Sequence, residues 1–234
     1  MLKILRTINY IINYLVSNNI NENKLYKSLN NLEEIKIVDI GSNQGDFFRK
    51  INRILNHPTL VVYSVDPNQE LLNKQNIQKG TLYKFPLAIG NFNGEADFYE
   101  KEISSHSSLL DINFNEELPH NETTKRKVEC KTLEKFISDQ NLKKIDILKI
   151  DIEGFESKIV TDIINITKFC EINIIKIEIM FRNDKGEYDD QNWLQILNVL
   201  SSSKFKLIGM SNIKYKNNKL FFFDAIFQNN LFKT

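Results

Sequence analysis

The sequence predicts an α/β domain built on an open, largely parallel sheet, and three observations predict it. The β-branched run over 35–40 is typical of a buried strand, and it leads through a two-glycine loop into helical spacing over 46–56. A second apolar run, over 60–65, ends in an acid about one βαβ unit after the acid of the first strand. A third, over 145–150, also leads through an acid and a glycine into a helix.

Length and composition suit one such domain. The chain has 234 residues with 41% hydrophobic content, and we expect a helical extension over 1–31 and the main domain over 32–234. A formal net charge of +1 gives no global attraction to nucleic acid, so we expect no such partner. Two isolated cysteines, Cys130 and Cys170, and three histidines argue against structural zinc and fit a reducing cytoplasm.

The first 18 residues favour an amphipathic helix, because the apolar side chains recur at helical spacing. Polar residues interrupt the run and no small-residue cleavage site follows, so we expect neither a signal peptide nor stable membrane insertion. Three roles stay open: packing on its own domain, packing on a second subunit in a homodimer, and weak attachment to a membrane surface.

The loop after the first strand has the pattern Asp39-x-Gly41-x-Asn43-x-Gly45. Glycine lets the backbone approach a ligand closely, and the following helix offers free N–H donors at its start. A pyrophosphate-binding loop would read G-x-G-x-x-G, and here an acid comes before the first glycine. That acid would repel a pyrophosphate, but it suits the ammonium and sulfonium charges of S-adenosylmethionine. An ordinary strand-to-helix turn is the competing interpretation.

The second strand ends in Asp66-Pro67, and an acid at that position can accept hydrogen bonds from both hydroxyls of a ribose. Asp66 as a simple turn former before Pro67 is the alternative. Ala88 is small and apolar at the edge of a later loop, which suits one face of an adenine ring.

The third strand carries Lys149 inside an apolar run, with Asp151 and Glu153 at its carboxyl end. An unpaired ammonium in a central strand would be costly, so we expect Lys149 to pair with Asp39 or Asp151. Glu178 ends a further buried strand over 172–180 near the same edge of the sheet.

The remaining elements follow from the same periodicities. We expect helices over 69–78, 133–140, 155–166 and 188–203, and strands over 81–85, 95–100, 127–131, 205–210 and 220–227. The last two strands pair as a closing hairpin across 211–219, and Asn93-Gly94 is typical of a hairpin turn. The polar loop over 104–108 could close over a site.

Four segments together resemble one known family: Val38–Gly45, Asp66-Pro67, Leu87–Gly90 and Lys149–Glu156. They are similar to the FkbM family of S-adenosylmethionine-dependent methyltransferases, from about Ile35 to Phe227, and K-I-D-x-E-G-x-E is the most specific part. The resemblance implies a Rossmann-like class I methyltransferase fold, a seven-stranded, mostly parallel sheet with helices on both faces and a C-terminal antiparallel hairpin. It also implies O-methylation of a hydroxyl on a sugar, surface glycan or natural product. Many relatives carry glutamate where this chain has Asp66, and either acid can hold a ribose.

The resemblance also implies roles for single residues. Gly41, Asn43 and Gly45 would line the methionine part of the cofactor with Asp39 near its amino group, Asp66 would hold the ribose, and Ala88 would lie near the adenine. Asp151 falls where related enzymes place an acid facing cofactor and substrate, so it is our first candidate for the base that removes the hydroxyl proton. Glu153, Glu178 and His106 are the other candidates.

Several points stay open at this stage. We assign no metal ligand, although the carboxylates could instead hold a Mg²⁺ ion that acidifies the hydroxyl. For His106 a solvated loop position is the alternative, and Glu156 is better explained as an acid at a helix start. A nicotinamide-dependent oxidoreductase and a catalytically inactive cofactor-binding subunit are the competing functions. The acceptor, a small molecule or glycan, would meet the loops over 104–124 and 180–190.

Overall fold

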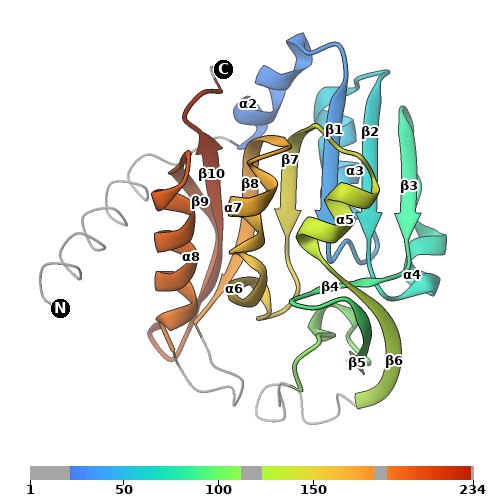
Figure 1. Ribbon diagram of the computed structural model, residues 1–234, viewed down its shortest axis with the longest axis vertical. Coiled ribbons are helices and arrows are strands. Elements are labelled where there is room, and N and C mark those ends of the chain that lie inside the picture. Colours follow the sequence, from blue (N-terminus) through green and yellow to red (C-terminus); the bar gives the residue numbers. More distant parts are fainter. Residues whose placement is uncertain (1–21, 112–122, 182–188, 233–234) are drawn as a thin grey trace, which may run out of the picture.

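The computed structural model describes residues 22–111, 123–181 and 189–232, and its centre is one seven-stranded sheet (Figure 1). The strands are β1 (Ile35–Ile40), β2 (Leu60–Val65), β3 (Thr81–Phe85), β7 (Lys144–Ile150), β8 (Glu171–Met180), β9 (Phe205–Lys216) and β10 (Lys219–Asn229). Their order is β3-β2-β1-β7-β8-β10-β9, and β10 alone runs antiparallel to its neighbours. The mostly parallel sheet with a C-terminal hairpin is therefore confirmed.

Helices cover both faces of the sheet (Figure 1). They are α2 (Glu22–Lys27), the 3₁₀ turn η1 (Ser28–Asn31), α3 (Asp46–Leu55), α4 (Gln69–Lys74), α5 (Leu133–Asp139), α6 (Glu156–Ile159), α7 (Asp162–Ile166) and α8 (Gln191–Ser202). One apolar core lies under α5 to α8, and a second joins α2 and α3 to the other face. Tyr26 and Leu29, which precede the first strand, are fully buried in the second core.

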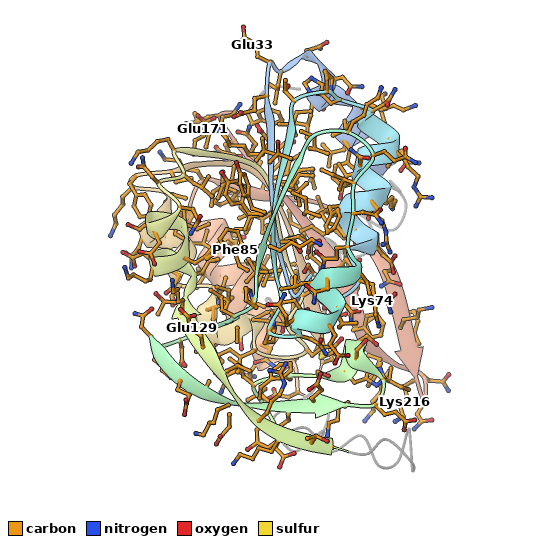
Figure 2. All side chains as sticks on the ribbon, turned by 90° about the vertical axis from the view of Figure 1, so that its right-hand side faces the viewer. Glu33, Lys74, Phe85, Glu129, Glu171 and Lys216 are labelled. Atoms are coloured by element: carbon orange, nitrogen blue, oxygen red, sulfur yellow. The ribbon has the colours of Figure 1, made fainter. Side chains whose placement is uncertain are left out.

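A second, three-stranded sheet lies beyond the carboxyl ends of the main strands. It consists of β4 (Ala88–Gly90), β5 (Gly94–Lys101) and β6 (Thr123–Thr132), in the order β4-β6-β5. Figure 2 shows Glu129 of β6 at this end of the molecule, with Glu33 and Glu171 at the opposite end. The predicted hairpin at Asn93-Gly94 is wrong, because β6 lies between the two flanking strands and pairs with both.

The boundaries of other elements also differ from those that the sequence predicted. The single helix expected over 155–166 is two short helices, α6 and α7. The loop expected over 211–219 is mostly strand, since β9 and β10 meet at Asn217 and Asn218, which both have positive φ as a tight hairpin turn requires. The helix expected over 69–78 ends at Lys74. By contrast, Thr132 caps α5 as predicted, accepting a hydrogen bond from the Lys135 N–H.

In the part of the chain that the structure describes, no helix is long and apolar enough to cross a membrane. The helix expected over the first 18 residues lies outside the described residues, as do 112–122 and 182–188 of the two loops expected to meet the acceptor.

Candidate active site

The glycine loop after β1 fits closely against the loop after β7. Gly41 has a φ of +70°, and a Cβ there would come within 1.7 Å of the Asp151 carbonyl oxygen, so no other residue fits. Asn43 also has positive φ, and its backbone N–H donates to Asp66 Oδ2 at 2.8 Å. The loop thus links the carboxyl ends of β1, β2 and β7.

A buried polar network supports this loop, and sequence reasoning missed it. The Gln75 side chain donates to the Asn43 carbonyl at 2.6 Å and to Ser42 Oγ at 3.0 Å. Ser64 Oγ donates to Gln75 Oε1 at 2.6 Å. Gln75 was expected inside the helix over 69–78, and nothing in its sequence context indicated that it follows α4 and holds the glycine loop.

Asp66 directly follows β2, and each of its two carboxylate oxygens accepts a hydrogen bond from a different backbone N–H. Asn43 N–H donates to Oδ2 and Asn68 N–H donates to Oδ1, both at 2.8 Å. Burial raises the pKa of Asp66, and the two N–H donors oppose that rise. Each oxygen keeps a lone pair, so the fixed carboxylate can accept further hydrogen bonds from a bound ligand.

Asp66 faces a first cavity, whose empty volume is about 690 Å³ when the open solvent at its mouth is included. Its wall is largely apolar, with Leu71, Leu87, Ala88, Ile89, Phe98 and Leu109 among the lining residues. An apolar slot with one fixed carboxylate has the chemistry of a nucleoside pocket. Ala88 lines it as expected, although it lies in strand β4 and not in a loop.

Lys149 is buried and ion-paired, as the sequence predicted. Its Nζ lies 3.3 Å from Asp39, 3.2 Å from Asp151 and 2.8 Å from the Gly41 carbonyl oxygen. Burial lowers the pKa of Lys149, but Asp151 and Asp39 outweigh it and raise the pKa above its ordinary value.

Asp39 lines neither cavity, because it lies fully buried behind Lys149. Burial raises its pKa to about 6, against the opposing effect of Lys149. The structure therefore places Asp39 behind Lys149, and the position expected for it, beside the cofactor's amino group, stays a prediction. Gly45 likewise lines neither cavity and stands at the start of α3.

A second cavity adjoins the first, and most of the residues that line it are charged or polar. Glu22, Lys50, Lys176, Glu178, Ser211 and Asp224 are among the residues that line it. Gly41, Asn43, Ser104, Ser105 and Asp151 line both cavities. Asp151 therefore stands where a ligand in one cavity would meet a ligand in the other. The polar loop over 104–108 forms part of this junction, but His106 lines neither cavity.

Three predicted site residues meet at the junction. Asp151, Glu153 and Glu178 each offer one carboxylate oxygen, and these three oxygens lie within 4.8 Å of one another. Burial and the negative charges of Asp151 and Glu153 raise the pKa of Glu178 well above its ordinary value. Glu156 has a different role, because it accepts a hydrogen bond from the Ile152 N–H at 2.7 Å and fixes the start of α6.

A second buried lysine was found on the same strand face as Glu178, but its partners were not predicted. Lys176 Nζ lies 2.9 Å from Glu22 of α2 and 2.9 Å from Asp224 of β10. Ser211 of β9 accepts a further hydrogen bond at 3.0 Å. The second cavity is thus bounded by elements from both ends of the described chain.

The strand order, with one antiparallel strand next to last, defines the Rossmann-like class I methyltransferase fold. The chain belongs to the FkbM methyltransferase domain family, whose sequence model matches residues 39–207. A 2-O-methyltransferase, NoeI of Sinorhizobium fredii, is 25% identical over 136 residues, which are 53% of this chain and 55% of the relative. The chain thus aligns with about half the length of this curated relative.

Two solved structures match this chain at low sequence identity. A methyltransferase FkbM from Methylobacillus flagellatus gives a TM-score of 0.48 at 12% identity, covering 83% of this chain and 43% of that one. TrmK of M. capricolum, in complex with S-adenosyl-homocysteine, gives a TM-score of 0.41 at 12% identity, covering 88% of this chain and 67% of that one.

Proposed function

We propose that this chain transfers a methyl group from S-adenosylmethionine to a hydroxyl oxygen of a polyhydroxylated acceptor. One observation carries the proposal: Asp151 stands at the wall shared by a largely apolar cavity that Asp66 faces and a second cavity lined mostly by charged and polar residues. A cofactor and an acceptor, one in each cavity, would meet at this carboxylate. Membership of the FkbM methyltransferase domain family supports the same reaction and gives no support to the nicotinamide-dependent alternative.

The first cavity suits the adenosyl part of the cofactor. Asp66 would accept hydrogen bonds from the ribose hydroxyls, and the apolar wall that includes Ala88 and Phe98 would contact the adenine. Gly41 lets the first loop pack against the backbone of Asp151, where a Cβ would collide, and this packing brings the two loops together at the junction of the cavities. When bound, the cofactor supplies a methyl group activated by its sulfonium charge.

The chain's own residues would align the reacting atoms and receive a proton. Lys149 would hold the Asp151 carboxylate in place, because its Nζ lies 3.2 Å from Asp151 Oδ2. As the oxygen–carbon bond forms, the carbon–sulfur bond breaks and its electron pair stays on sulfur, while the hydroxyl proton passes to Asp151. Glu153 and Glu178 lie close enough to substitute or assist. His106 lines neither cavity, so we rank it below these carboxylates.

The second cavity suits a sugar-like acceptor, because carboxylates, ammonium groups and Ser211 offer many hydrogen bonds to hydroxyls. The name of the relative NoeI, a 2-O-methyltransferase, agrees with methylation at oxygen. Both cysteines are free and buried, which suits the reducing cytoplasm that we propose for this protein.

The test is methyl transfer from labelled S-adenosylmethionine to a panel of mono- and oligosaccharides. Asp151→Asn keeps the shape of the side chain and removes its charge, so turnover should fall by roughly 10²-fold or more while cofactor affinity changes little. Asp162→Asn, in an acid that lines neither cavity, is the matched control. Transfer by Asp151→Asn at the wild-type rate would exclude Asp151 as the base, and Glu178 would be tested next.

A further inference from the structure

The three carboxylates at the junction have the spacing of ligands around one ion. Asp151 and Glu153 follow β7, Glu178 lies near the end of β8, and their ligand oxygens lie within 4.8 Å of one another. Two ligands of one ion are separated by at most twice the metal–oxygen distance, about 4.2 Å for Mg²⁺ and about 4.8 Å for Ca²⁺. In an octahedral Mg²⁺ site, neighbouring ligand oxygens lie about 3.0 Å apart and opposite ones about 4.2 Å, so the three carboxylates would draw closer together when they bind the ion.

Glu178 gives a second, independent indication that a ligand binds at this cluster. Its side chain is more than nine-tenths buried and faces the second cavity, with a relative exposure of 7%. Its Oε2 has no hydrogen-bond partner among the described residues. A buried carboxylate oxygen without a donor is costly, so such an oxygen is normally satisfied by a partner.

Lys149 and Lys176 already make ion pairs with other carboxylates. Lys149 lies against Asp39 and Asp151, and Lys176 is held by carboxylates from α2 and β10. Neither ammonium makes an ion pair with Glu178 among the contacts of the described residues. A cation from solution would satisfy the oxygen that these lysines leave unsatisfied.

We propose that Asp151, Glu153 and Glu178 bind one divalent cation, Mg²⁺ or Mn²⁺, at the junction of the two cavities. All three ligands are oxygens, which these hard cations prefer. Three protein oxygens would leave further coordination positions on the ion, and Asp151 and Glu178 both line the second cavity. On the proposed function, two neighbouring oxygens of the acceptor would fill those positions, so the favoured acceptors carry vicinal hydroxyls.

In that arrangement the ion would hold the reacting hydroxyl and lower its pKa. The proton would pass to the Asp151 carboxylate oxygen that does not bind the ion, and the methyl transfer would be otherwise unchanged. The ion thus deepens the proposed function, and it changes the expected acceptor from any hydroxyl compound to a chelating one.

Calorimetry with MnCl₂ alone tests the site without cofactor or acceptor. The wild-type protein should bind one Mn²⁺, and Glu178→Gln and Glu153→Gln should each weaken binding by about tenfold or more. Glu102→Gln is the matched control, because Glu102 is an exposed acid that lines the same cavity outside the cluster. Circular dichroism melts show whether each variant folds, and Glu153→Gln, on a partly exposed loop, decides the matter if Glu178→Gln does not fold.

Two results would overturn the ion site: no Mn²⁺ binding by the wild-type protein, or binding that both cluster variants leave unchanged. A parallel titration with S-adenosylhomocysteine in EDTA separates this proposal from the proposed function. Mn²⁺ binding without binding of S-adenosylhomocysteine would contradict the proposed methyl transfer and would still support the ion site. If the rate of methyl transfer changes neither with EDTA nor with added Mg²⁺, the ion has no role in the reaction, and the proposed methyl transfer still holds.

Discussion

Lys149 and Lys176 are register partners on the neighbouring strands β7 and β8, and both lie buried in otherwise apolar runs. Each ammonium contacts two carboxylates. They differ in where those carboxylates come from. Lys149 pairs with its register partner Asp39 on β1 and with Asp151, which directly follows its own strand, whereas Lys176 pairs with residues of α2 and β10.

This difference explains why one ion cluster was predictable and the other was not. Strand alternation places Lys149 and Asp151 on one face, and a glycine loop after each of β1 and β7 indicates that these strands are neighbours. Glu22 is 154 residues from Lys176, and only the packing of α2 on the sheet brings them together. The pairing of Asp224 depends on the register of an antiparallel strand, which the sequence does not specify.

The two clusters differ in their most buried carboxylate. The two lysine side chains are 9% and 11% exposed, and Asp151, one partner of Lys149, is 34% exposed. The other partner of Lys149, Asp39, is fully buried, whereas the partners of Lys176 are 11% and 14% exposed. Both lysines line the second cavity, as do Asp151, Glu22 and Asp224, so Asp39 is the one member of the two clusters that does not reach this wall.

The largest expected effect is on stability when each lysine is replaced. Lys149→Met should destabilise the fold by about 3–5 kcal/mol, because it leaves Asp39 buried without a partner. Lys176→Met should cost about 1–3 kcal/mol, since water reaches its partners more easily. Lys149→Ala should cost more than Lys149→Met, because it also removes the volume of the side chain. Urea unfolding of the three variants measures the order, and equal losses for the two Met variants would refute the effect of this difference in burial.

An intermediate effect is expected from pH. The pKa of Asp39 is raised from 3.8 to about 6 in the folded protein, so the folded state binds this proton more tightly than the unfolded chain does. Asp39 therefore lowers stability progressively as pH rises from about 4 to about 6, and its effect is constant above that range. The stability of wild type minus that of Asp39→Asn should fall by about 3 kcal/mol across the whole titration.

Urea unfolding at several pH values checks this, and a difference that is flat or rises with pH would contradict it. Lys149 behaves in the opposite sense. Its pKa is raised above the ordinary 10.5, so its stabilising contribution is present below pH 10.5 and is lost only as pH rises beyond that value.

The smallest effects are expected at the outer edge of the Lys176 cluster. Lys50 contacts Glu22 at 3.2 Å, but its side chain is 49% exposed, so Lys50→Ala should change stability by less than about 0.5 kcal/mol. Glu22→Gln should cost about 1 kcal/mol, because it removes a partner of the buried Lys176. Thermal melts of both variants give the comparison, and a larger loss for Lys50→Ala would reverse the assignment of inner and outer contacts.

The main sheet and most of the site could be predicted because both depend on short sequence patterns. Apolar runs gave the strands, and the acids and glycines at their ends gave Asp66 and Asp151. The small sheet could not be predicted, because β6 pairs with β4 and β5 across a long segment. Gln75 and Glu22 act through tertiary contacts alone, so no local pattern distinguishes them from surface residues. The roles assigned to the site residues remain predictions.

The most direct test of the central claim is calorimetry of the protein with S-adenosylhomocysteine and, separately, with NAD. We predict one binding site for the adenosyl compound, with a dissociation constant on the order of micromolar, and no heat with NAD. Asp66→Ala should weaken that binding by about 1–3 kcal/mol, because the ribose hydroxyls lose their charged acceptor. Heat with NAD and none with S-adenosylhomocysteine would contradict the account, and so would unchanged affinity in Asp66→Ala.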